Sequence, residues 1–137
     1  MELTRVGAIS LVVLLGLLVL FQLALALGAP WGRAAFGGFT DRPGTSLRVA
    51  SVVAVLVWTT VALAMLRRAG LSTWAPFPDS WLTVVAWVVT GVLGLSIVVN
   101  LVSQSALERT IWVPFGIVAT GLAVVVALAP SVSPAAQ

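Results

Sequence analysis

The stretch that decides the fold is residues 6–27, which read VGAISLVVLLGLLVLFQLALAL and contain no charged side chain. A helix needs about 20 consecutive apolar residues to cross the hydrocarbon core of a bilayer, and this run is long enough to do so. It also exceeds the apolar core of a secretory signal peptide, which has about 7–15 residues. We therefore expect a retained membrane helix, ended by Gly28 and Pro30, which are typical of helix C-termini.

Three further apolar runs follow, at about residues 47–66, 81–101 and 111–128. Because backbone polar groups inside a bilayer must be satisfied within each segment, each run is predicted to be a helix. Short connections favour antiparallel neighbours. The sequence thus predicts an all-α membrane protein, an antiparallel four-transmembrane-helix bundle. It would form a single membrane domain over residues 1–137, with a tail at 129–137.

The composition agrees with this class and excludes much chemistry. Hydrophobic residues make up 61% of the chain and charged residues 8%, whereas soluble domains have about 45–50% and about 25%. The absence of His and Cys excludes disulfides, thiolate sites and His-based acid–base catalysis. The serines also lack a His, Lys or Cys to activate them. We therefore expect no enzyme activity, no metal and no cofactor.

The basic residues are seven Arg and no Lys, and the formal net charge is +3. No basic run is longer than Arg67-Arg68, so we expect membrane-flanking anchors rather than a nucleic-acid surface. Arg without Lys, with abundant Ala, Gly and Val, indicates a GC-rich bacterial genome and hence a bacterial cytoplasmic (inner) membrane. Arg5 and the Arg67-Arg68 pair favour cytoplasmic N- and C-termini.

Small residues at helical spacing mark packing faces. The third run carries Ala86, Thr90 and Gly94, and the fourth carries a matching stripe of Ala119, Ala123 and Ala127. Small residues let membrane helices approach closely, so these runs are predicted to pack together within one chain rather than across a dimer. Because four short spans enclose little volume, we also expect a homo-oligomer or a larger membrane complex.

Polar side chains at membrane depth collect toward one face. Gln22 lies near the end of the first run and Asn100 at the end of the third, and both runs point the same way. The loops at 28–46 and 102–110 belong to that face. The candidate ligand- or lipid-binding residues there are Gln22, Trp31, Arg33, Arg48, Asn100, Glu108 and Arg109.

Two interpretations of this face remain open. In one, Asp41 and Glu108 form interfacial salt bridges with the arginines and tie the two hairpins together. In the other, the arginines bind the phosphate or carboxylate of a ligand or lipid headgroup. Glu108 is expected to be interfacial rather than deeply desolvated, which argues against a catalytic or proton-carrying role. Trp58 and Trp87 are predicted at similar depth, as an aromatic pair or as the wall of a small cavity for an apolar ligand.

The segment Gly28-Ala29-Pro30-Trp31-Gly32 with Phe36-Gly37-Gly38, and the Glu108-Arg109 pair, resemble those of small four-span bacterial integral membrane proteins of unassigned function. The resemblance implies that the first loop and the Glu-Arg pair form the defining face. It implies nothing about chemistry.

The function expected is that of a non-enzymatic integral membrane protein, an accessory, scaffold or lipid-interacting unit with an Arg-rich interfacial binding face. Its partners would be membrane lipids and no nucleic acid. The alternative is a small oligomeric transporter or channel for an ion or an amphiphilic small molecule, with Gln22 and Asn100 lining the path.

Overall fold

The computed structural model describes residues 1–130, and this part of the chain contains helices and loops but no strand. Its α-helices are α1 (Glu2–Ala26), α2 (Thr45–Arg68), α3 (Leu82–Leu101) and α4 (Ala106–Ala127). Short 3-10 helices precede α2 and α3, namely η1 (Gly32–Ala34), η2 (Phe36–Gly38) and η3 (Asp79–Trp81). From residue 131 on, the predicted tail at 129–137 lies outside the described residues.

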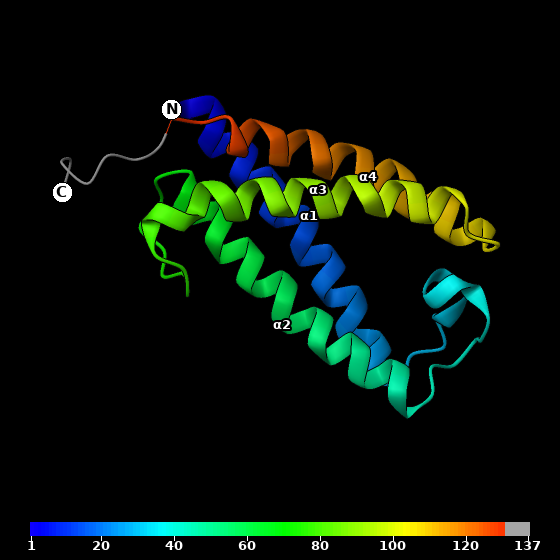
Figure 1. The fold of residues 1–137 in the computed structure, drawn as a ribbon. Helices are drawn as coiled ribbons and strands as arrows, with labels where there is room; N and C mark the ends of the chain where they lie inside the picture. Colours follow the sequence, from blue (N-terminus) through cyan, green and yellow to red (C-terminus); the bar gives the residue numbers. More distant parts are fainter. Residues whose placement is uncertain (131–137) are drawn as a thin grey trace.

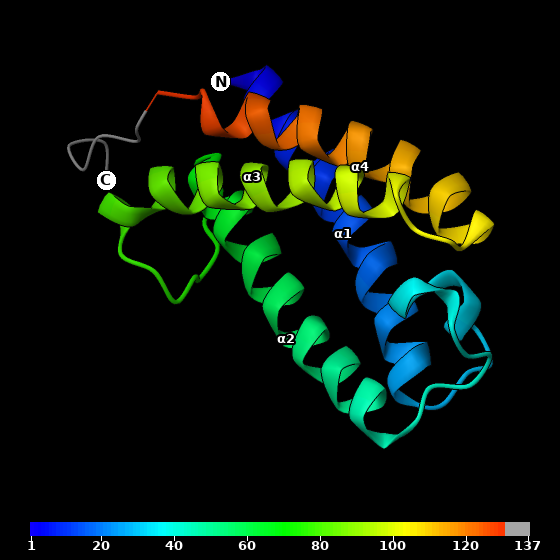
Figure 2. The same cartoon turned by 45° about the vertical axis from the view of Figure 1, so that its right-hand side comes forward.

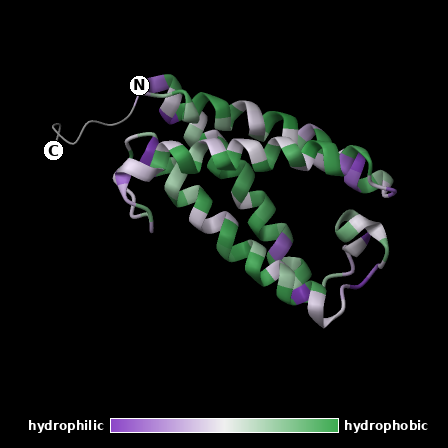
Figure 3. Ribbon diagram, viewed as in Figure 1, coloured by the Kyte–Doolittle hydropathy of each residue, from purple (hydrophilic) through white to green (hydrophobic). Residues whose placement is uncertain are grey.

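The α-helices within residues 1–130 form the predicted four-helix membrane bundle. Each is long and apolar enough to span a membrane. Hydrophobic residues run along the helices, whereas hydrophilic residues gather toward their ends and in the loops (Figure 3). Many large apolar side chains are exposed, as a surrounding lipid phase requires, because no water-soluble surface would present so many of them. The chain is therefore a multi-pass membrane protein.

The bundle consists of two hairpins that diverge. Helix α1 runs beside α2, and α3 runs beside α4, while the first hairpin leans away from the second (Figures 1 and 2). We call the end with the start of α1, residues 69–78 and the end of α4 the closed end. The open end has the first loop (residues 27–44) and the third loop (residues 102–105), and there the hairpins are splayed apart.

The closed end holds the main core, in which all the α-helices of residues 1–130 take part. Its buried side chains are Ala8, Leu11, Leu15, Leu18, Met65, Ala69, Ala86, Val89, Leu93, Ala119, Ala123, Val126 and Ala127. The predicted small-residue stripes of α3 and α4 are part of it. A Cβ on Gly94 would lie 3.9 Å from the Thr120 methyl group, so the two helices pack closely within one chain, as expected.

Arg68 joins the two hairpins at the closed end, whereas the sequence predicts a membrane-flanking anchor. Its side chain is buried, and its guanidinium donates hydrogen bonds to the carbonyls of Ala127 (3.3 Å), Ala129 and Pro130 (3.1 Å). The last carbonyls of a helix have no partner within the helix. Arg68 therefore caps α4 from the other hairpin. Its neighbour Arg67 instead forms an exposed ion pair with Asp79 (2.6 Å).

Two predictions about helix starts were wrong. Helix α4 begins at Ala106 rather than near residue 111, because the Ser105 hydroxyl accepts a hydrogen bond from the Glu108 backbone N–H (3.3 Å) and caps the helix. The sequence also predicts Asp79 or Ser80 as the N-cap of the third helix, but this cap is not formed, since the Asp79 carboxylate binds Arg67. Helix α1 ends as predicted, with Gly28 in the left-handed region at φ +94°.

Candidate functional site

A cavity of about 220 Å³ lies between the two hairpins toward the open end. Its walls are mostly apolar and aromatic, and a group of polar residues also lines it. The lining residues are Leu18, Phe21, Gln22, Ala34, Ala35, Phe36, Trp58, Leu93, Ser96, Asn100, Glu108, Trp112 and Phe115. The two helix pairs and the first loop thus contribute to one amphipathic site, which is the arrangement typical of ligand pockets.

The aromatic side chains of this site support one another. The rings of Phe21 and Trp112 meet edge to face with centroids 4.8 Å apart, and Trp112 meets Phe115 in the same way at 5.3 Å. Such edge-to-face pairs are favourable beyond the area that they bury. The cluster joins α1 to α4 and forms one wall of the cavity.

Both amides predicted as site residues line this cavity. The Asn100 side chain donates to the Ser96 carbonyl (2.7 Å), and the Ser96 hydroxyl donates to the Leu93 carbonyl (2.6 Å). The Gln22 Oε1 atom differs, because it is buried without a hydrogen-bond partner within the described residues. A buried acceptor left unsatisfied is costly, so this atom favours a ligand or water that donates to it.

Glu108 is the third polar group, and it is buried within the protein, contrary to the prediction that it is not deeply desolvated. Its side chain is only 6% exposed. One carboxylate oxygen accepts the Gly37 backbone N–H (2.8 Å), and the other accepts the Ser103 hydroxyl. The expected salt bridge to an arginine is not formed within the described residues. Glu108 is buried because α4 begins early and brings the first turn of the helix beneath the first loop.

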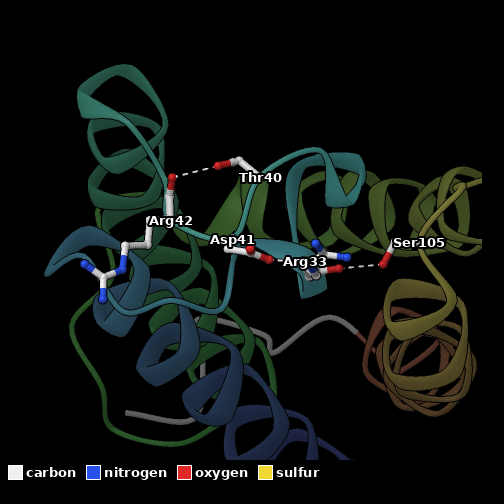
Figure 4. Close-up of polar contacts among 5 residues, drawn as sticks. All are labelled: Arg33, Thr40, Asp41, Arg42 and Ser105. Carbon is white, nitrogen blue, oxygen red and sulfur yellow. Dashed lines mark hydrogen bonds and ion pairs between the residues drawn. The ribbon is translucent and has the colours of Figure 1, made fainter.

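The first loop covers this end of the cavity and is hydrogen-bonded to the hairpin of α3 and α4. The Ser105 hydroxyl donates to the Arg33 carbonyl (2.5 Å; Figure 4), and the Trp112 ring N–H donates to the Ala34 carbonyl (2.6 Å). With the Gly37–Glu108 bond, these contacts join segments more than 70 residues apart. The loop therefore bridges the hairpins where the helices themselves separate.

Glycines make this loop conformation possible. Phe36, Gly37 and Gly38 are consecutive residues in the left-handed region, with φ values of 55°, 78° and 72°. Gly tolerates this region without steric cost. A Cβ on Gly32 would lie 2.3 Å from the Thr40 carbonyl oxygen, so the loop could not close there with any other residue. The glycines that the resemblance singled out thus shape the loop.

The arginines predicted as an anion site bind groups of the protein itself and stand apart from this cavity. Arg33 forms an ion pair with Asp41 (Figure 4), which raises the pKa of the Arg33 guanidinium above its ordinary value. Arg48 donates to the Ala26 carbonyl (2.8 Å), and Arg109 donates to the Ser103 carbonyl. These arginines are exposed and do not line the cavity. Of the first interpretation, only the Arg33–Asp41 salt bridge is formed within residues 1–130, and it lies within the first loop and does not tie the hairpins together.

Of the other tryptophans singled out in the sequence, one lines the cavity and two lie outside it. Trp31 stacks on Phe21 with centroids 6.1 Å apart and is about half exposed at the rim, outside the cavity lining. Trp58 lines the cavity, but this is not the small apolar cavity predicted between Trp58 and Trp87, because Trp87 does not line it. Trp87 is exposed, and within residues 1–130 it makes no aromatic pair with Trp58.

Sequence reasoning missed the aromatic wall and Ser96. The signal was available as spacing: Ser96 and Asn100 are four residues apart, and Glu108, Trp112 and Phe115 follow at intervals of four and three. Residues so spaced share one face of a helix. The Ser105-to-Glu108 spacing is also that of a capping pair, and it would have placed Glu108 inside a helix.

Searches of protein-family models, curated proteins and solved structures find no match to this chain.

Proposed function

We propose that the protein is a non-enzymatic membrane protein that binds a small amphiphile or part of a lipid in the cavity between its hairpins. One observation carries the proposal: the cavity combines apolar and aromatic walls with a buried acceptor that has no partner, Gln22 Oε1. A cavity of about 220 Å³ exceeds the roughly 150 Å³ that admits benzene in a protein core. It would hold a head and the first carbons of a chain, while the rest of the chain extends toward lipid.

The binding surface proposed here differs from the Arg-rich face expected from the sequence. Arg33 is engaged with Asp41, and Arg48 and Arg109 are engaged with backbone carbonyls. Their contribution would be to hold the first loop and the helix ends around the cavity. We further propose a bacterial inner membrane as the location, with cytoplasmic termini.

Two neighbouring leucines of α1 offer a matched test. Leu18 lines the cavity and is 9% exposed, whereas Leu17 is 57% exposed and faces outward. Leu18→Trp would fill the cavity, and Leu17→Trp would add the same group on the lipid side. The protein in phosphatidylcholine nanodiscs is titrated separately with dodecanol, dodecylamine and dodecanoate, and binding is measured by native mass spectrometry.

We expect Leu18→Trp to weaken binding of at least one of these probes about tenfold, and Leu17→Trp to leave it within twofold of the wild type. Equal behaviour of the two variants with every probe would contradict the proposal. Thermal unfolding followed by tryptophan fluorescence provides the control that both variants are folded.

Transport is the second candidate function. Gln22 and Asn100 line the same cavity, as a path for an ion or amphiphile would require. Beyond the cavity, Leu11, Leu15 and Val126 fill the closed end, so transport needs that end to open. Flux through liposomes that falls at least tenfold on Gln22→Leu would favour transport. Equal flux in liposomes with and without the protein would leave amphiphile binding as the function.

A further inference from the structure

We propose that the preferred ligand of the cavity carries a protonated amine. The inference rests on the proposed function and adds the chemical class of the head group. It comes from three features of the polar end: a buried carboxylate with no cation beside it, an unpaired amide oxygen, and an aromatic wall.

The carboxylate of Glu108 is the first feature. It is 6% exposed, and its two hydrogen-bond donors, the Gly37 N–H and the Ser103 hydroxyl, are both neutral. A carboxylate accepts about four hydrogen bonds, so it retains capacity for another donor. Burying a charge is costly unless a partner compensates it. A ligand cation in the cavity would supply that compensation.

The chain itself supplies no such cation within the described residues. Of the two arginines in the covering loop, Arg33 pairs with Asp41, and Arg42 is exposed and outside the cavity lining. Arg109, next to Glu108 in sequence, donates to the Ser103 carbonyl. The Arg48 side chain donates a hydrogen bond to the Ala26 carbonyl at the end of α1. None of them lines the cavity. The residues that do line it include one carboxylate and no basic side chain, so an anionic head would be repelled.

The other lining groups suit the same ligand. Gln22 Oε1 is a buried acceptor without a partner, and an ammonium group has several N–H donors to offer. The faces of tryptophan and phenylalanine rings attract cations, and Trp58, Trp112 and Phe115 line the cavity together with Glu108. A hydroxyl head would satisfy Gln22 but would gain less from Glu108 and from the rings.

The test compares three probes with the same chain and different heads. Dodecylamine, dodecanol and dodecanoate are titrated at pH 7, where the amine is protonated, into the wild-type protein in phosphatidylcholine nanodiscs. We expect dodecylamine to bind about tenfold more tightly than dodecanol, and dodecanoate to bind more weakly than either.

Glu108→Gln should bring dodecylamine to within threefold of dodecanol without changing dodecanol by more than twofold. The matched control is Asp41→Asn, which removes a carboxylate from the same end but outside the cavity lining. It should keep the tenfold preference for the amine. Equal losses in Glu108→Gln and Asp41→Asn would overturn the proposal, because general surface charge would then explain the preference.

A second variant avoids the contact between Glu108 and the first loop. Phe115→Leu removes a ring and no hydrogen bond, so we expect dodecylamine affinity to fall about threefold and dodecanol affinity to stay within twofold. If dodecanol or dodecanoate matches the amine in the wild type while Leu18→Trp still weakens binding, this inference is wrong and the proposed function stands. If Leu18→Trp and Leu17→Trp are alike for every probe, the proposed function itself is wrong.

Discussion

The closed and open ends of the molecule hold the two hairpins together in different ways. At the closed end, alanines such as Ala119 and Ala123 allow the helices to approach, and Arg68 caps one hairpin from the other. At the open end the larger rings of Phe21 and Trp112 hold the hairpins apart, and a loop spans the gap. A small membrane bundle can thus keep a cavity by concentrating its core at one end.

The largest effect is expected at Arg68, because its guanidinium connects the hairpins at the closed end. Arg68→Leu would remove the donor of the buried Ala127 carbonyl at the end of α4 and of the Ala129 and Pro130 carbonyls that follow it. Since hydrogen bonds to charged groups contribute about 1.5–3 kcal/mol, we expect the free energy of unfolding to fall by at least that amount. Thermal and denaturant unfolding in detergent, followed by tryptophan fluorescence, measure the change.

The adjacent Arg67 is the matched control for this prediction. Its ion pair with Asp79 is exposed to water, and exposed pairs contribute about 0.2–1 kcal/mol. Arg67→Leu should therefore destabilise the protein much less than Arg68→Leu. Similar losses for the two variants would mean that Arg68 does not join the hairpins.

The next effect concerns the first loop. Gly32→Ala would bring a Cβ to 2.3 Å from the Thr40 carbonyl, and overpacking of this kind costs about 1–3 kcal/mol. Because the loop belongs to the open end, we expect faster amide exchange in residues 32–41 and weaker amphiphile binding, while the closed end keeps its protection. Hydrogen exchange with mass spectrometry measures both ends at once.

Gly44→Ala is the control for the loop, since a Cβ there meets nothing within 4 Å. It should leave exchange and binding unchanged. If Gly32→Ala instead raised exchange across α1 and α4 at the closed end, the two ends would not be independent.

The smallest effect is expected at the cap of α4. Ser105→Ala removes the helix cap and the hydrogen bond to the Arg33 carbonyl, and loss of a cap costs about 1 kcal/mol. Ser46→Ala, at an exposed position in the first turn of α2, is the control. We expect a small decrease in melting temperature for Ser105→Ala and none for Ser46→Ala; a decrease of the same size in both would contradict the cap.

The spans could be predicted from the sequence because the bilayer thickness sets their length, and because a helix satisfies the hydrogen bonds of its backbone N–H and C=O groups within the segment. The stripe from Ala119 to Ala127 likewise predicted the α3–α4 packing. The site could be predicted only in part. Gln22, Asn100 and Glu108 line the cavity, whereas Arg48 and Arg109 bind nearby backbone carbonyls. Whether an arginine binds a ligand or such a carbonyl depends on which of them its side chain can reach, and the sequence does not give that distance.

The divergence of the hairpins was not predictable in the same way. It depends on how Phe21, Trp112 and Phe115 pack across helices, and spacing along one helix does not determine that. The cover over the cavity depends on tertiary bonds such as Gly37 to Glu108, between residues 71 apart in sequence.

Disulfide cross-linking tests the claim that the hairpins are in contact at the closed end and separated by a cavity at the open end. The chain has no Cys, so each variant can carry one introduced pair of cysteines and no other thiol. A Cβ added at Gly7 would lie 3.7 Å from the Val125 Cβ, and the two Cβ atoms of a disulfide are about 3.5–4.5 Å apart. Gly7→Cys with Val125→Cys should oxidise nearly completely, and Gln22→Cys with Asn100→Cys, both lining the cavity, should stay reduced. Equal cross-linking of the two pairs in membranes, scored by maleimide gel shift, would contradict the claim.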